Sequence, residues 1–169
     1  MVALKGVAFD RDQTVSVHEV VSETIQDYRK FHASLRALDV ASDDATETLA
    51  WLSERVETPF PNVTENIQEY QLKGGRLCLL VGQRLGALTH SKSDSQIAVY
   101  IFPGALDRIF DLSNLYDGGP ASFVQSGVTT MVREQHGLVV VLPSSEPSDE
   151  LRKFASAFRR SMNGLEQQT

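Results

Sequence analysis

The chain has 169 residues, of which 41% are hydrophobic and 22% are charged, the ordinary make-up of a globular protein. A chain of this length buries about 70% of the surface that its unfolded form exposes, so we expect a single domain over residues 1–169. The formal net charge of −6 argues against a nucleic-acid binder, because phosphate contacts need a concentrated basic patch. We interpret the nearest basic cluster as a solvated helix face: Arg152, Lys153, Arg159 and Arg160.

Cys78 is the only cysteine, which excludes an intrachain disulfide and a multi-cysteine metal site. It lies between Leu77 and Leu79 in an apolar run, so we predict a buried small side chain rather than a reactive thiol. No run approaches the roughly 20 apolar residues of a membrane span, and the N-terminus lacks an apolar signal core. As written, the chain is expected to be soluble.

The first predicted helix covers residues 17–38, after an irregular lead-in over residues 1–16. Its side chains recur at spacings of four and three residues and line one face: Val21, Ile25, Tyr28, His32 and Leu35. A core domain follows over residues 43–160, and residues 163–169 are expected to form a frayed tail.

The second predicted helix has a clear start signal. Asp44 can cap its free amides and Glu47 can reach back, as in a capping box. Pro59 and Pro61 stop the helix, and we expect Trp51 where it meets a sheet. Its buried stripe is Ala45, Leu49, Leu52 and Val56.

An antiparallel meander is predicted next, because the apolar period changes to two. Gly74-Gly75 and Gly82-Gln83 supply the predicted hairpin turns. The predicted strands are 66–73, 76–81, 84–90 and 96–102. The last is apolar on both faces, which is typical of the middle of a covered sheet; its alternating sets are Ile97, Val99 and Ile101, and Ala98, Tyr100 and Phe102.

The last third contains a second hairpin and a helix. Residues 105–112 are predicted to be a short helix or a loop, and residues 117–120 a turn. Strands at 128–133 and 138–142 flank a turn at 135–137. Ser145 or Ser148 caps the final helix, with Pro147 in its first turn; its buried side is Leu151, Phe154, Ala155 and Phe158. The predicted fold is α+β: an antiparallel sheet of about five or six strands, packed with N-terminal helices and a C-terminal helix.

Three motifs between Asp43 and Phe158 follow one another in a recognisable order. They are Trp51-Leu52 followed by Arg55 on a helix, the strand Gly74-Gly75-Arg76-Leu77, and a Gly137-Leu138 strand before a helix with Asp149-Glu150-Leu151. This order resembles the extracytoplasmic domain of membrane-anchored anti-sigma factors, a family of bacterial transcriptional regulators.

The resemblance implies a non-catalytic regulatory or sensor domain. Family members carry a short cytoplasmic sigma-binding domain and one membrane helix before this domain, so we expect this chain to be the outer part of a longer protein or a relative that has lost its anchor. The family's His-x-x-x-Cys-x-x-Cys signature is absent, so the expected link to a sigma factor is indirect. The expected location is periplasmic or otherwise extracytoplasmic, with cytoplasmic as the alternative.

A different chemistry is suggested near the N-terminus. Asp10 and Asp12, with Thr14 after an apolar run, resemble the first motif of haloacid-dehalogenase-like phosphatases, where one carboxylate is the nucleophile and Mg²⁺ neutralises the phosphate. Ser144 follows an apolar strand as the second motif would, and only Asp149 and Glu150 could supply the late acidic pair. The alternating βα units of that family are missing. A small phosphatase is therefore the alternative function.

We assign no catalytic, cofactor-binding or metal-binding residue. His18, His32, His90 and His136 lack ligand spacing and are expected to pack or to face solvent. The glycine pairs at 74–75 and 118–119 are interpreted as turns rather than phosphate loops, and Ser126, Ser144 and Ser145 lack a nucleophile elbow. The expected partner is another protein or a second copy, bound through residues 105–123 or the first helix.

Overall fold

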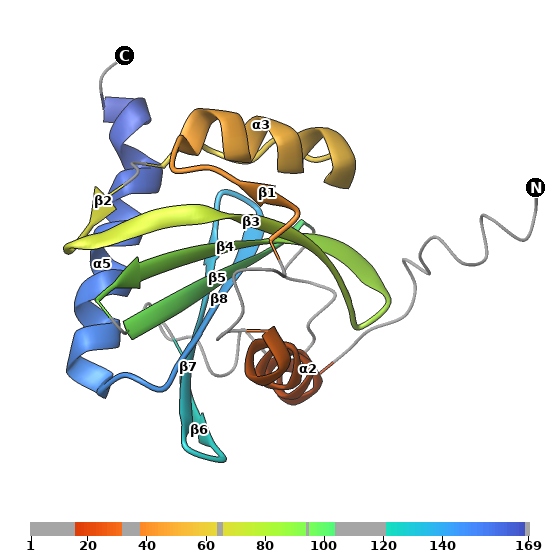
Figure 1. The fold of residues 1–169 in the computed structure, drawn as a ribbon. Helices are drawn as coiled ribbons and strands as arrows, with labels where there is room; N and C mark the ends of the chain where they lie inside the picture. The colour runs from red at the N-terminus through yellow and green to blue at the C-terminus, as the bar shows by residue number, and fades with distance from the viewer. Residues whose placement is uncertain (1–15, 32–37, 64–65, 94, 104–120, 168–169) are drawn as a thin grey trace, which may run out of the picture.

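The computed structural model describes residues 16–31, 38–63, 66–93, 95–103 and 121–167. Its centre is one antiparallel sheet, with helices packed against both faces (Figure 1). The predicted α+β class is confirmed, although the described residues form eight strands of this sheet where the sequence predicts five or six. None of the helices in the described ranges is both long enough and apolar enough to cross a membrane.

The strands lie in the order β1-β3-β4-β5-β8-β7-β6, and β2 also pairs with β3. Their bounds are β1 Val40–Ala41, β2 Asn66–Ile67, β3 Tyr70–Leu80, β4 Gln83–Lys92, β5 Ser95–Pro103, β6 Ala121–Gln125, β7 Val128–Gln135 and β8 Leu138–Ser144. The prediction of a central strand covered on both faces is confirmed, because β5 lies in the middle and its alternate side chains enter two separate apolar cores.

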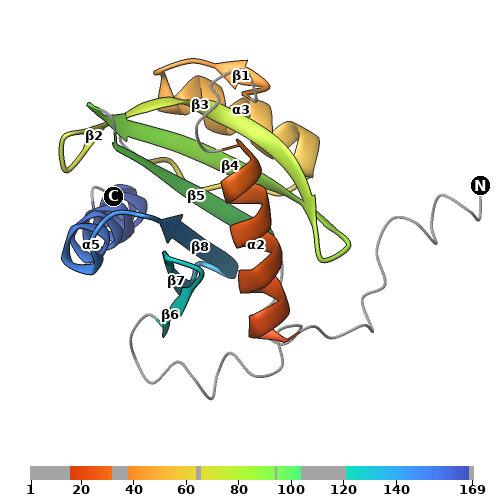
Figure 2. The same cartoon turned by 60° about the horizontal axis from the view of Figure 1, so that its bottom comes forward.

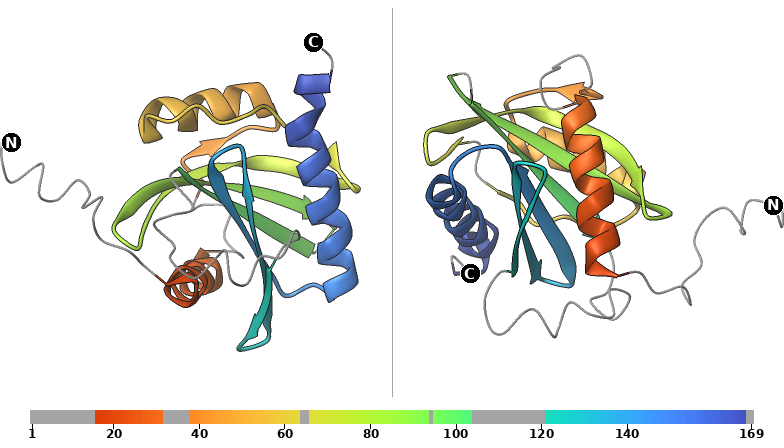
Figure 3. Two further views of the ribbon diagram at one scale, coloured as in Figure 1. Left: turned by 180° about the vertical axis from the view of Figure 1, so that it is seen from behind. Right: turned by 90° about the horizontal axis from the view of Figure 1, so that it is seen from below.

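Each face of the sheet has its own helices. Helix α2 (Val17–Phe31) covers one face, and α3 (Ala45–Val56) and α5 (Ser148–Gln167) cover the other (Figures 2 and 3). The predicted buried sides of α3 and α5 are confirmed. Helix α5 runs to Gln167, past Asn163, where the sequence predicts that the tail begins.

The capping of α3 follows the prediction with one change. The Asp44 carboxylate accepts a hydrogen bond from the Glu47 amide at 3.0 Å, as expected of an N-cap. Glu47 does not reach back to the Asp44 amide. Instead the Ser42 hydroxyl bridges them, donating to Glu47 Oε2 and accepting from the Asp44 amide, each at 3.1 Å. The helix ends at Glu57, whose φ of 61° is left-handed.

The predicted hairpin turn at Gly74-Gly75 is wrong, because β3 runs straight through both residues. A Cβ on Gly74 would lie 2.1 Å from the Val40 carbonyl oxygen, and one on Gly75 would lie 3.0 Å from Leu52 Cδ1. The glycines are needed because β1 and α3 approach the strand closely at this point. A register shift between Leu72 and Gly74 marks a bulge there.

Two-residue turns that end in glycine and have positive φ close three of the other hairpins. They lie at Val81-Gly82, Ser126-Gly127 and His136-Gly137. The first is one residue earlier than predicted, and the third confirms the prediction. The second closes β6 onto β7, and the sequence reading missed β6, although Ser-Gly between two β-rich runs is a hairpin signal.

Four further predictions concern element ends or connecting segments. Helix α2 is described only to Phe31, so the predicted continuation to residue 38 falls mainly on residues outside the described ranges, as do the predictions for 105–112 and 117–120. Helix α5 begins at Ser148, and its Leu151 amide donates to the Pro147 carbonyl at 3.0 Å. Pro147 therefore precedes the first turn rather than lying in it.

Candidate functional site

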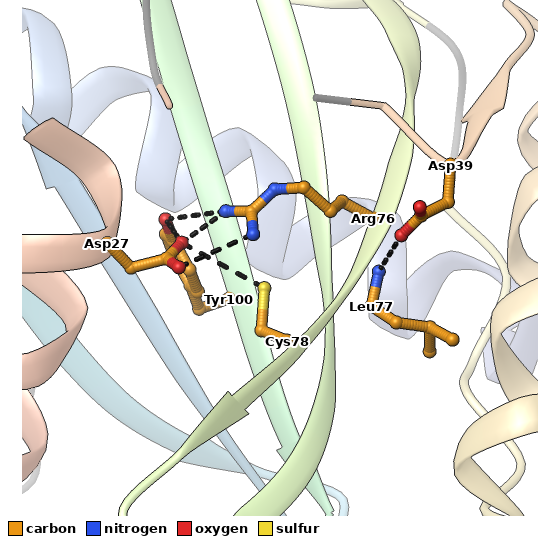
Figure 4. Close-up of polar contacts among 6 residues, drawn as sticks. All are labelled: Asp27, Asp39, Arg76, Leu77, Cys78 and Tyr100. Carbon is orange, nitrogen blue, oxygen red and sulfur yellow. Dashed lines mark hydrogen bonds and ion pairs between the residues drawn. The ribbon is translucent and has the colours of Figure 1, made fainter. Parts of the chain in front are cut away.

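The most concentrated polar cluster among the described residues lies under α2. Asp27 of α2, Arg76 of β3 and Tyr100 of β5 point toward one another between the helix and the sheet (Figure 4). Arg76 binds the Asp27 carboxylate through both terminal nitrogens, with Nη1 3.3 Å from Oδ1 and Nη2 paired with Oδ2. The Tyr100 hydroxyl donates to Asp27 Oδ2 at 2.6 Å. The side chains of Asp27 and Arg76 are only 11% and 13% exposed.

Sequence spacing and strand register bring these residues together. Asp27 borders the buried stripe of α2, one residue before the buried Tyr28. Across the sheet, Arg76 faces Ala87 and Ala87 faces Tyr100, so the three lie in one row on three neighbouring strands. The small Ala87 side chain leaves room for the guanidinium and the phenol to converge on one carboxylate.

Charge and burial hold Arg76 charged and Tyr100 protonated. Burial lowers the pKa of Arg76, but the hydrogen bond and charge of Asp27 outweigh this effect and raise it overall. Burial, followed by the Asp27 charge, raises the pKa of Tyr100 far above its usual value. The Arg76 guanidinium also lies 4.3 Å from the centre of the Phe31 ring, a cation–π contact.

Cys78 borders the cluster, with Sγ 3.9 Å from Asp27 Oδ2. Burial, together with the neighbouring Asp27 carboxylate, raises the pKa of its thiol to about 12. A nucleophilic cysteine needs a lowered pKa and access to solvent, and Cys78 has neither. The prediction of a buried thiol is confirmed.

Helix α2 also makes polar contacts with the ends of three hairpin or loop segments. The Val81 amide donates to Glu23 Oε1 at 2.8 Å, and the Ser145 amide donates to the Tyr28 hydroxyl at 3.4 Å. Arg29 donates to the Ser126 carbonyl in the β6–β7 turn. The helix is therefore fastened to the sheet by a central ion pair and by contacts near the rim.

His90 is the most unusual polar group on the opposite face. It is fully buried under α5, its ring centre is 5.2 Å from that of Phe154, and neither ring nitrogen has a hydrogen-bond partner. Burial lowers its pKa to about 3, so it is neutral at physiological pH. Its packing role agrees with the prediction. His18 and His136 are exposed, and His32 lies outside the described residues.

The residues singled out for chemistry are not brought together. Asp10 and Asp12 lie outside the described residues, Ser144 is buried with its hydroxyl accepting from the Glu146 amide, and Glu150 pairs with Lys92 at 2.5 Å. Within the described ranges, no group of three or more histidine, cysteine or carboxylate side chains could hold a metal.

Other predicted positions can be placed on the fold. Trp51 is half-buried at the margin of the core, and Leu52, fully buried, makes the contact with the sheet that was predicted for the tryptophan. The four cations of α5 are exposed as predicted, and three of them line a shallow depression of about 260 Å³ with Gln68 and Ser156: Arg152, Lys153 and Arg160. Of the predicted binding region 105–123, only residues 121–123 are described, and they belong to β6.

Sequence reasoning missed the Asp27–Arg76–Tyr100 cluster. The available signal was Arg76, a lone cation on the strand face that also carries Cys78 and Leu80, since a buried cation needs a carboxylate partner. The partner could not be chosen from spacing, because Asp27 is 49 residues away. No protein-family model matches the chain, and no curated protein matches it.

Proposed function

We propose that the chain is a non-catalytic regulatory or sensor domain, of the kind its motifs resemble in anti-sigma factors, and that it controls transcription through a tethered sigma-binding domain outside these 169 residues. In this proposal the chain lies on the extracytoplasmic side of a membrane and binds a protein partner there. Its link to the sigma factor is indirect.

The observation that carries the proposal is the way α2 is attached. The Asp27–Arg76–Tyr100 cluster joins a helix to a sheet through groups that are all paired, and the neighbouring thiol of Cys78 is protonated. Burial raises the pKa of both the Cys78 thiol and the Tyr100 phenol, so neither is activated as a nucleophile or as a proton donor at neutral pH. The cluster does provide a contact between α2 and the sheet that can be made or broken. A ligand that binds more tightly to one of these two states increases the population of that state.

The residues behind the resemblance support the same reading. Leu52 of α3 packs on Gly75 of β3, and Arg76 of the same strand binds α2. These motif residues attach helices to both faces of the sheet, which is an architectural role. A domain that works by changing its helix contacts would depend on such residues, whereas a catalytic domain would keep reactive groups there.

A transcript measurement in the source organism tests the proposal. Deleting the segment that encodes this chain should change one set of transcripts that share a promoter element. Asp27→Ala should change the same set of transcripts. Glu19→Ala changes an exposed carboxylate on the same helix and should leave the transcripts as in the wild type. Immunoblots must show that the variants are present in equal amounts. If deletion leaves all transcripts unchanged, the regulatory proposal is wrong.

A binding assay distinguishes two possibilities: that a separate tethered domain binds the sigma factor, as proposed, or that this chain binds it directly. We expect the purified chain not to bind a purified sigma factor. If it binds and free core polymerase competes, the chain is itself the inhibitory domain.

The alternative phosphatase has its own assay. With Mg²⁺ and a generic phosphomonoester we expect no hydrolysis above background, for the wild type and for Asp10→Asn. A Mg²⁺-dependent rate that Asp10→Asn abolishes would favour the alternative, because it would require a nucleophilic carboxylate.

A further inference from the structure

Among the described residues, the two most exposed large apolar side chains lie on opposite edges of the sheet. Leu79 on β3 is 72% exposed and Val124 on β6 is 75% exposed. Edge strands offer unpaired backbone groups to other chains, and proteins usually protect them with short covering strands, charges or prolines. The two edges of this sheet differ in that protection.

The β3 edge is covered and capped. Strands β1 and β2 pair with two parts of it, at Gly74–Gly75 and at Tyr70–Gln71. Beyond β1, the Asp39 carboxylate accepts a hydrogen bond from the Leu77 amide at 2.7 Å. A side chain thus takes the place that another strand would occupy.

Among the described residues, the β6 edge has no covering strand, charged residue, proline or capping side chain. No described strand pairs with its outer side, and its sequence Ala121-Ser122-Phe123-Val124-Gln125 contains neither charge nor proline (Figure 3). The two-residue turn makes Gln125 and Val128 a hydrogen-bonded pair, so the backbone groups of Gln125, Phe123 and Ala121 face β7. Those of Ser122 and Val124 therefore face outward.

We propose that β6 is a dimer interface with a second copy of this chain. The two β6 strands run antiparallel about a two-fold axis at Phe123. Ser122 and Val124 of one copy exchange backbone hydrogen bonds with Val124 and Ser122 of the other. The two Phe123 side chains face each other across the axis as a non-hydrogen-bonded pair, and the two sheets become continuous.

A second copy fits this edge better than another occupant for three reasons. The outward groups are spaced symmetrically about Phe123, and an antiparallel copy supplies donors opposite acceptors at each of them. The strand is uncharged, so two chains of net charge −6 can meet here without placing like charges in contact. Aromatic cross-strand pairs stabilise sheets, and Phe123 already packs partly against the α2 core.

The hairpin is held ready for pairing. Arg29 of α2 donates to the Ser126 carbonyl and Ser22 donates to Gln125 Oε1, so the helix fixes the hairpin on the sheet. A strand of five residues is only about 17 Å long. The interface alone buries less than stable dimers do, and we expect a weak dimer that forms at high protein concentration.

Disulfide trapping tests the register. In a non-hydrogen-bonded antiparallel pair the two Cα atoms are about 4.5 Å apart, within the range that a disulfide spans. Phe123→Cys should therefore give covalent dimers under mild oxidation. Val124→Cys, on the same strand but facing Ser122 of the other copy, and Leu79→Cys, on the opposite edge, are the matched controls. The native Cys78 is buried and does not compete.

We expect Phe123→Cys to cross-link at least tenfold faster than either control, although both control positions are more exposed. Random collision predicts the reverse order. Faster cross-linking of Leu79→Cys, or of Val124→Cys, would overturn the proposal.

Sedimentation equilibrium gives an independent test without cysteines. The wild type should show concentration-dependent dimers. Val124→Lys should weaken association at least tenfold, and Leu79→Lys, the same charge change at the other edge, should leave it unchanged. Both variants should keep the wild-type circular dichroism spectrum. A wild type that stays monomeric at millimolar concentration would refute the β6 dimer, and it would leave the regulatory proposal to its own transcript test.

Discussion

The two faces of the sheet hold their helices in different ways. On the α2 face, a charged and fully hydrogen-bonded cluster of Asp27, Arg76 and Tyr100 lies within the apolar contact. On the other face, α3 packs directly on glycines and α5 covers His90, a polar side chain without a partner. Removing one partner of a buried ion pair is costly because it leaves an unpaired buried charge, whereas apolar packing has no charge that must stay paired. The α2 attachment therefore includes a buried ion pair, whereas the α3 and α5 attachments depend mainly on apolar packing, with one partly exposed ion pair between Lys92 and Glu150.

The largest predicted effect comes from breaking the ion pair. Arg76→Met leaves the Asp27 carboxylate buried without its cation, and removing one partner of such a pair costs about 3 to 5 kcal/mol. Urea denaturation measures this loss. Combining Arg76→Met with Asp27→Asn should recover at least half of it, because the amide oxygen can still accept from Tyr100. A cost below about 1 kcal/mol for the single change would mean that the pair is solvated, as surface pairs are.

The second prediction concerns pH and His90. The pKa of this histidine is about 3 in the folded chain and 6.5 at its ordinary value, so between these values only the unfolded chain binds the proton. The contribution to stability is complete above pH 6.5 and falls as the pH is lowered, by about 1.4 kcal/mol per pH unit. From pH 6.0 to 4.5 the wild type should lose about 2 kcal/mol more than His90→Leu.

Parallel denaturation curves of both proteins at several pH values measure that difference. The variant controls for carboxylates elsewhere, which titrate equally in the two proteins. If the free energies of unfolding of the two proteins change equally with pH, His90 is hydrogen-bonded to a partner or to water in solution.

The third prediction concerns the close packing of α3 on Gly75 of β3. Gly75→Ala would place a methyl group 3.0 Å from both Leu52 Cδ1 and Thr48 Cγ2, so α3 must move outward. Overpacking of this kind costs about 1 to 3 kcal/mol. In thermal denaturation, the double variant Gly75→Ala/Leu52→Ala should lose less stability than the sum of the two single variants, because the smaller side chain at position 52 makes room for the added methyl group. Full additivity would indicate that the glycine is needed for its backbone alone.

The smallest effect is expected at Trp51. A fully buried aromatic side chain costs about 3 to 5 kcal/mol to remove, but Trp51 is half-buried and its ring is covered by Arg55 at 4.0 Å. We expect Trp51→Ala to cost about 1 to 2 kcal/mol by denaturant titration, less than half of the cost of removing a fully buried aromatic side chain. A value near 4 kcal/mol would place the indole in the core in solution.

Local sequence signals predicted much of the fold correctly. The Asp44 cap, the stripe of α3, the two-sided apolar pattern of β5 and the hairpin at His136-Gly137 all depend on residues a few positions apart. Their structures follow from capping, periodicity and turn chemistry. Cys78 was placed correctly for the same reason, since its immediate neighbours are apolar.

The errors concern contacts between distant residues. Gly74-Gly75 has the composition of a turn, but the approach of Val40 and Leu52 keeps it extended. The short β6 was overlooked because five uncharged residues become a strand only when β7 pairs with them.

The amino-acid sequence alone determined the element types, the α+β class and the burial of the apolar runs, because these depend on local backbone preferences and on the removal of apolar surface from water. Only the tertiary structure decided which charges meet. Arg76 contacts Asp27, 49 residues away, because the docking of α2 on the sheet brings the two side chains together, and nothing in the local spacing encodes that contact. The candidate site therefore depended on the packing of α2 against the sheet.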